Sequence, residues 1–272
     1  MKKILLVGDL VGYGKIALSS IIPILSEMGI EVSNLPTALV SNTFDYKISS
    51  MLDTTTYMNE AIEVWRKLNL QFDIILTGFL SNLEQVSLIE NIISFQNKKP
   101  LIITDPILGD DGALYHGLKK DSIDTMKKMI YLSDIILPNV TEIQILSNAK
   151  IKKDLREEDI NEYIELISKE YNCSVVVTSS EIDSGNYIFS YDNNTGHLSK
   201  IKYKKIPYKF AGTGDLFAGL FTGLLSKSFD LHKACERSSE IITTILKLEY
   251  LEKSSGVRDV KIEKYLEFFR KI

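Results

Sequence analysis

The decisive stretch of this 272-residue chain reads Phe210-Ala211-Gly212-Thr213-Gly214-Asp215-Leu216-Phe217. It predicts a glycine-rich turn that runs directly into a helix, with Asp215 in the first helical turn. Backbone N–H groups at such a helix start have no partner within the helix, and the helix dipole adds partial positive charge there. Phosphate groups therefore bind readily at this position. A carboxylate and a phosphate repel each other, so Asp215 is not expected to bind the anion. We therefore interpret Asp215 as a reacting group, the base of a phosphoryl transfer.

Short apolar runs alternate with amphipathic stretches along the whole chain, which is typical of a layered α/β fold. We expect buried strands at residues 4–8, 31–35, 74–77, 101–104, 135–137 and 174–178. We expect helices at residues 15–28, 55–68, 83–96, 121–132, 157–171, 215–226 and 232–250. Alternating residues at 187–191 and 197–205, joined by Asn193-Asn194-Thr195-Gly196, predict a hairpin that leaves the parallel sheet.

This order of elements predicts a three-layer α/β/α fold with a mostly parallel central sheet. We expect a single domain over residues 1–272, with a small β excursion at 187–205. The net charge is −4, and no basic block indicates a nucleic-acid or membrane partner. The N-terminal apolar run is too short for a signal peptide, and Cys173 and Cys235 are expected to be buried free thiols. We therefore predict a cytoplasmic protein.

Polar or glycine residues follow five of the predicted strands. In open α/β sheets, ligands bind beyond the carboxyl ends of the strands, so these residues are expected to meet along one edge. They are Asp9, Thr77-Gly78, Asp105, Asn139 and Thr178. Acids cluster after two of the strands, at residues 105–111 and at Glu142. Two plainer interpretations stay open at this point, a solvated acidic loop and a helix cap formed by Asn139 and Glu142.

Phosphoryl transfer would give all of these groups a role. The amides of Gly212, Thr213 and Gly214 would form an anion hole for the transferring phosphoryl group. Mg²⁺ binds a few carboxylates and keeps several waters, and the candidate metal ligands are Asp105, Asp110 and Glu142. Asp215 would orient an alcohol and accept its proton.

A second glycine cluster, residues 8–17, allows a competing interpretation. A P-loop is excluded, because five residues separate Gly8 from Gly14 and Ile16 cannot bind Mg²⁺. The pattern Gly12-x-Gly14-x-x-Ala17, followed by Glu31, does fit a dinucleotide fingerprint. An NAD-binding oxidoreductase is therefore an alternative from another class, although it leaves Asp215 without a role.

The motifs resemble those of one known superfamily. Gly212-Thr213-Gly214-Asp215 resembles the G-[TAV]-G-D signature of the ribokinase-like small-molecule kinases, and Asn139-Val140-Thr141-Glu142 matches their N-x-x-E motif. Within that superfamily the chain is most similar to the pyridoxal and pyridoxamine kinases of vitamin B6 salvage. The segments that carry this similarity are residues 9–14, 39–43, 77–80, 105–110 and 137–139.

The resemblance implies an ATP- and Mg²⁺-dependent kinase that phosphorylates the 5′-hydroxymethyl group of a B6 vitamer. A monovalent cation such as K⁺ is a further candidate cofactor, and the family is often homodimeric. By resemblance, ATP and its metal contact Asn139, Glu142 and Thr178, and residues 187–205 cover the nucleotide or help to form a lid. A plain surface hairpin is the alternative for residues 187–205. Also by resemblance, the substrate contacts Asp9, Val11, Thr43 and Phe79.

Three of these substrate positions depart from the family pattern, and one of them is Thr43, because this chain has Ser41-Asn42-Thr43-Phe44 where the family has Ser-Asn-His-Thr. Asp9 stands where well-studied pyridoxal kinases have a serine, and Phe79 stands where they have a tyrosine. An acid at Asp9 could pair with a ring N–H or a charged amine, which would favour pyridoxamine. A hydroxymethylpyrimidine kinase is the nearest alternative, although its S-G-G-A-G first loop is absent here. A non-catalytic ligand-binding homologue is another.

Overall fold

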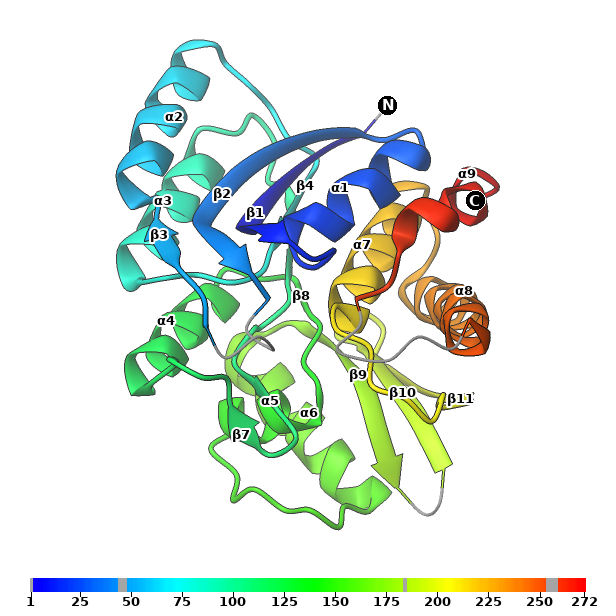
Figure 1. Cartoon of the computed structure of the whole chain (residues 1–272). Coiled ribbons are helices and arrows are strands. Elements are labelled where there is room, and N and C mark those ends of the chain that lie inside the picture. Colours follow the sequence, from blue (N-terminus) through cyan, green and yellow to red (C-terminus); the bar gives the residue numbers. More distant parts are fainter. Residues whose placement is uncertain (1, 44–47, 183–184, 253–258) are drawn as a thin grey trace.

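A nine-stranded sheet forms the middle layer of the computed structural model, which describes residues 2–43, 48–182, 185–252 and 259–272 (Figure 1). The strands lie in the order β11-β10-β9-β8-β5-β4-β1-β2-β3. Their bounds are β1 Lys3–Tyr13, β2 Glu31–Asn42, β3 Met51–Asp53, β4 Ile74–Thr77, β5 Leu101–Thr104, β8 Ile135–Ile136, β9 Ser174–Ile182, β10 Gly185–Asp192 and β11 His197–Tyr203. The strands from β9 to β2 are parallel, and antiparallel strands extend both ends of the sheet.

Helices cover both faces of this sheet, which confirms the predicted three-layer fold (Figure 1). One apolar core packs α1, α7 and α8 against one face, and a second packs α2 to α6 against the other. The helices are α1 Leu18–Glu27, α2 Thr55–Lys67, α3 Leu83–Ser94, α4 Lys120–Ile130, α5 Val140–Leu146, α6 Glu157–Tyr171, α7 Thr213–Ser226, α8 Leu231–Leu251 and α9 Leu266–Arg270. Whether they form a single domain over residues 1–272 stays a prediction.

The apolar run at the start of the chain shows why the sequence favours this arrangement. Successive side chains of a strand point to opposite faces of the sheet. Ile4 and Leu6 accordingly lie in the first core, whereas Leu5 and Val7 lie in the second. A central strand that is buried on both faces needs such an unbroken apolar run.

Strands β1 and β2 extend further than predicted. Their pairing continues past a register shift between Gly8 and Leu10, and it ends at the pair Tyr13 and Asn42. The predicted strand ended at Gly8 because polar and glycine residues follow it. Strand β3 and the two-stranded sheet of β6 (Gly109–Asp110) and β7 (Ala113–Leu114) were not predicted, because these strands are too short to show a period.

The predicted hairpin exists as β10 and β11, but it does not leave the sheet. β10 pairs antiparallel with β9 from Gly185↔Ile182 to Tyr191↔Val175, so the hairpin extends the sheet by two strands. Its turn lies beside the first residue of β9, because Asn193 N donates to Ser174 Oγ (3.1 Å). The turn is therefore at the amino-terminal edge of the parallel strands, and the ends Gly185 and Tyr203 are at the carboxyl edge. A lid role for this segment stays a prediction. Only the ends at Gly185 and Tyr203 are on the carboxyl edge, so only they could form part of a lid.

Two simpler expectations concern the thiols and the membrane. Cys173 and Cys235 are buried free thiols, as predicted. Within the described ranges, no helix is long and apolar enough to span a bilayer.

Candidate active site

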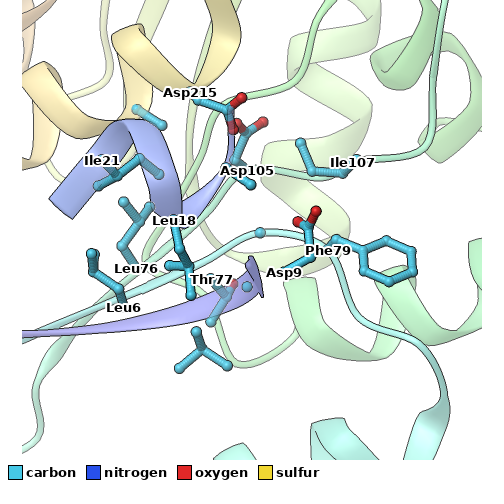
Figure 2. Close-up of a pocket in the computed structure, with 15 residues that line it drawn as sticks. Leu6, Asp9, Leu18, Ile21, Leu76, Thr77, Phe79, Asp105, Ile107 and Asp215 are labelled. Carbon is cyan, nitrogen blue, oxygen red and sulfur yellow. The ribbon is translucent and has the colours of Figure 1, made fainter. Parts of the chain in front are cut away.

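Three acids meet in one pocket at the carboxyl ends of the central strands (Figure 2). Asp9 extends from β1, Asp105 follows β5, and Asp215 lies in the first turn of α7. Gly78 and Phe79, which follow β4, line the same pocket, whereas its inner wall is apolar and includes Leu6, Leu18, Ile21 and Leu76. Figure 2 shows the carboxylates of Asp105 and Asp215 pointing into the same space. The predicted meeting of strand ends is thus present for these residues.

The start of α7 has the features expected of an anion-binding turn. Gly212 adopts a left-handed conformation (φ 77°), and no side chain in the described part of the chain caps the helix. A Cβ at Gly212 would lie 2.7 Å from Ile16 Cγ2 and 3.0 Å from Lys15 O, so only glycine fits here. Leu216 N donates to Gly212 O (3.0 Å) and begins the helical hydrogen bonding. The N–H groups of Thr213, Gly214 and Asp215 precede that first bond, which is the arrangement that binds anions.

The pocket acids hold their protons more tightly than free carboxyl groups. Burial raises the pKa of Asp215 to about 6, and a backbone hydrogen bond from Ala17 opposes this rise. Burial and the charge of Asp215 together raise the pKa of Asp9 to about 7. The pKa of Asp105 is raised well above its usual value by burial, then by Glu142 and Asp215. Such perturbed acids in a pocket are typical of functional sites.

Asn139 and Glu142 form a reciprocal helix cap at the start of α5. Glu142 N donates to Asn139 Oδ1 (3.0 Å), and Asn139 N donates to Glu142 Oε2 (2.9 Å). Leu108 N also donates to Glu142 Oε1 (3.0 Å), which joins the cap to the loop after Asp105. Burial raises the pKa of Glu142 to about 8, against the effect of these backbone bonds. The capping interpretation is therefore confirmed, and a role with ATP or metal stays a prediction.

The predicted metal ligands do not form a ready-made cage. Among the described residues, no group of three or more His, Cys, Asp or Glu side chains is arranged to hold a metal ion. Lys209 Nζ lies 3.1 Å from Asp110 Oδ2 and 2.6 Å from Asp111 Oδ2, so Asp110 already has a cationic partner. Among the residues that the structure describes, no cationic side chain pairs with Asp105 or Glu142, and burial, followed by the charges of Glu142 and Asp215, raises the pKa of Asp105. This buried, uncompensated negative charge fits a hard divalent cation that keeps several waters.

The remaining predicted residues lie around the pocket. Val11 and Phe79 belong to one small buried apolar cluster with Ala38 and Val40. Thr43 is buried beside Gly14, where a Cβ would lie 3.0 Å from Thr43 Cγ2. Val11 and Thr43 are outside the set of residues that line the pocket of the three acids. Thr178 N donates to Pro138 O (3.0 Å), which places Thr178 next to the α5 cap.

Several site residues were missed by sequence reasoning. Ala17 and Ile107 line the pocket. Ala17 could have been found from its position just before a helix, and Ile107 from its position just after the strand-end acid Asp105. Ala17 has an unusual backbone (φ 48°, ψ −136°), which delays the start of α1 to Leu18 instead of residue 15. No sequence pattern indicated Asp259, whose side chain accepts a hydrogen bond from Lys15 N at 2.5 Å.

The dinucleotide interpretation does not fit this geometry. A Rossmann fingerprint needs its glycines in the turn between strand and helix. Here Gly12 lies inside β1, next to β2, and a Cβ on it would be 3.2 Å from Ser41 O. The glycine serves close strand packing, which removes the support for an NAD site.

The protein-family comparison matches residues 24–261 to the phosphomethylpyrimidine kinase family. The chain belongs to this family. The match spans the acids after β5, the α5 cap and the turn before α7. As a member of a kinase family, the chain is an ATP-dependent phosphotransferase, which confirms the enzyme class that the resemblance implied.

Related proteins and solved structures agree with this assignment. The pyridoxal kinase of Dictyostelium discoideum is 27% identical over 273 residues, covering 93% of this chain and 88% of the relative. A Bacteroides thetaiotaomicron protein, described as a phosphomethylpyrimidine kinase and solved with pyridoxal, is 33% identical with a TM-score of 0.90, covering 98% of this chain and 95% of its own. The pyridoxal kinase of Lactobacillus plantarum is 26% identical with a TM-score of 0.89, covering 99% of this chain and 96% of its own. These similarities confirm the ribokinase-like fold of the pyridoxal kinase type.

Proposed function

We propose that this kinase phosphorylates the 5′-hydroxymethyl group of a vitamin B6 vitamer, with ATP as the donor. The main support for this proposal is the position of Asp215. It is a half-buried acid at the uncapped start of α7, and it lines the same pocket as Asp9. The names of the Dictyostelium and Lactobacillus relatives, and the pyridoxal solved with the Bacteroides protein, support this substrate class.

In this proposal Asp215 is the general base. A pKa of about 6 leaves it ionised at neutral pH and still basic enough to accept a proton. The hydroxyl oxygen bonds to the γ-phosphorus as the hydroxyl proton passes to Asp215. The bond between that phosphorus and the β,γ-bridging oxygen breaks, and ADP leaves. The amides of Gly212, Thr213 and Gly214 stabilise charge on the transferring group.

Nucleotide and metal belong on the side of the pocket nearer α5. We assign ATP contacts to Asn139, Glu142 and Thr178, and metal contacts to Asp105, Glu142 and Asp110. Bound Mg²⁺ would neutralise phosphate charge during the transfer. Asp110 would have to leave its ion pair with Lys209 to bind the metal. Turnover after dialysis against a chelator, with Mg²⁺ and then K⁺ restored separately, tests both ions.

The substrate ring belongs on the opposite side, near Asp9 and the apolar cluster of Val11 and Phe79. Asp9 is 9% exposed, and none of the residues that line its pocket carries a positive charge. A substrate with a protonated nitrogen would supply the missing partner and lower the pKa of Asp9. We therefore propose a preference for pyridoxamine, whose amine is charged, over pyridoxal.

Phosphorylation of hydroxymethylpyrimidine is the second candidate, because the matching family is described as phosphomethylpyrimidine kinase. An ADP-release assay over pyridoxal, pyridoxine, pyridoxamine, hydroxymethylpyrimidine and ribose separates the candidates. Turnover of the B6 vitamers at the highest kcat/KM is the expected result. A higher kcat/KM for the pyrimidine, or turnover of ribose alone, would overturn the B6 assignment while leaving the kinase intact.

The proposal also covers the oligomeric state and the cellular compartment of the protein. We propose a homodimer in the cytoplasm, supported by the resemblance of the chain to a family that is often dimeric. Sedimentation of the purified protein over a range of concentrations tests the dimer, and fractionation of cells tests the compartment.

A further inference from the structure

The C-terminal segment reaches back to the candidate active site through Asp259. Its carboxylate accepts a hydrogen bond from Lys15 N at 2.5 Å, across 244 residues of sequence. Its backbone forms a parallel bridge with Ala211, the residue before the anion-binding turn. One residue therefore joins two segments that are far apart in the chain and that both border the pocket.

The first of these segments is the loop Gly14–Ala17, which packs directly on the anion-binding turn. Ile16 and Lys15 O occupy the space where a Cβ of Gly212 would be, at 2.7 and 3.0 Å. The loop holds two residues in unfavourable conformations for most side chains, Gly14 (φ 107°) and Ala17 (φ 48°). A strained non-glycine residue persists only where its surroundings hold it in place.

The far end of this loop faces the proposed base. Ala17 and Asp215 line the same pocket, and Ala17 supplies a backbone hydrogen bond to the Asp215 carboxylate. Lys15 also forms an ion pair with Glu263 (3.0 Å), but through its exposed ammonium group and not its backbone. The contact with Asp259 thus holds the loop through the backbone N–H of Lys15, in addition to the bridge that Ala17 forms with Leu10.

We propose that Asp259 is a positioning residue for the kinase reaction. It locks the loop Gly14–Ala17 against Gly212, and so fixes both the anion-binding amides and the carboxylate of Asp215. This inference rests on the proposed role of Asp215 as base, but not on the identity of the alcohol. Since rates in such sites depend on orientation, loss of the lock lowers kcat and leaves substrate binding nearly unchanged.

The test compares Asp259→Ala, Asp259→Asn and the control Glu263→Gln. Asp259→Ala removes the acceptor, and we expect kcat to fall about tenfold to a hundredfold with both KM values within about threefold. Asp259→Asn keeps an accepting oxygen and should retain kcat within about threefold. Glu263→Gln breaks only an exposed ion pair with the same Lys15, and exposed pairs contribute little, so its kcat should match that of the parent.

Three outcomes would overturn the proposal: an unchanged kcat in Asp259→Ala, an equal loss in Asp259→Asn, or an equal loss in Glu263→Gln. If Asp259→Ala does not fold, an ester in place of the Lys15 peptide N–H removes the donor instead, with the same expected results. Hydrogen exchange at Lys15 N and Leu216 N needs no turnover, so it separates a failed lock from a failed kinase assignment. Both amides should exchange at least about tenfold faster once the lock is lost, and unchanged exchange would contradict it.

Discussion

At the residue scale, the pocket concentrates acids without a cationic side chain among its lining residues. Asp9, Asp105 and Asp215 all line it, and each has a raised pKa because of burial. A protein keeps such uncompensated charges at a cost to its stability. The arrangement is explained if a cation, a protonated substrate or a proton fills the pocket during the reaction cycle.

The stability cost of Asp9 should depend on pH. Its pKa is about 7 in the folded protein against 3.8 for a free aspartate, so the folded state binds this proton more tightly. Stability from this group is therefore present at low pH and is lost as pH rises towards 7. We expect Asp9→Asn to raise the melting temperature by roughly 5 °C at pH 8 and by less than about 2 °C at pH 5.

Thermal melts of the parent, Asp9→Asn and Asp154→Asn at both pH values check this expectation. Asp154 is exposed, so its variant controls for the loss of one surface charge. An equal change at pH 5 and pH 8 would show that the charge of Asp9 is not the destabilising element.

Asp9 should also influence which B6 vitamer the enzyme prefers. Replacing Asp9 with serine removes the negative charge that would pair with an ammonium group. We expect Asp9→Ser to shift the ratio of kcat/KM values from pyridoxamine towards pyridoxal, by about tenfold for one lost buried ion pair. If the ranking of the two vitamers is unchanged, Asp9 does not contact the amine.

At the scale of elements, the turn before α7 depends on a close approach between two segments. Gly212 and Gly29 have nearly the same backbone conformation, with φ of 77° and 74°. A Cβ at Gly29 would meet no atom within 4 Å, whereas at Gly212 it would meet Ile16 at 2.7 Å. The pair therefore separates the effect of backbone strain from that of crowding.

We expect Gly212→Ala to lower kcat at least about tenfold and the unfolding free energy by about 3 kcal/mol. Gly29→Ala should cost about 1 kcal/mol, for backbone strain alone, and leave kcat unchanged. Urea unfolding and steady-state kinetics of both variants provide the comparison. Similar kcat values for the two variants would mean that the contact with Ile16 does not shape the anion-binding turn.

At the scale of the whole molecule, periodic patterns predicted most of the fold. Residues 74–77, 101–104 and 157–171 are bounded as expected, because continuous apolar runs and an amphipathic stripe depend only on local sequence. The exact extent of β1 and β2 was missed, since their later pairing is set by contact between strands and not by composition. The hairpin was predicted correctly. Its pairing with β9 was not, because alternating polar and apolar residues do not specify which strand the hairpin pairs with.

For the candidate site as well, some contacts could be predicted from the sequence and others could not. Asp9, Asp105 and Asp215 could be predicted to meet, because topology brings strand ends together. The partnership of Lys209 with Asp110 and that of Asp259 with Lys15 could not, because each joins segments about 100 or more residues apart without a motif. Topology therefore predicts that these three acids meet, whereas the supporting contacts depend on tertiary packing that local sequence does not specify.

If Asp215 accepts the proton of the substrate hydroxyl, the variant Asp215→Ala removes the base of the reaction. Asp121→Ala is the matched control, because Asp121 is an exposed acid in the first turn of another helix, α4. We expect Asp215→Ala to lower kcat by about a hundredfold or more while the dissociation constant for ATP stays within about threefold. We expect Asp121→Ala to behave like the parent. Near-normal turnover in Asp215→Ala would show that Asp215 is not the base.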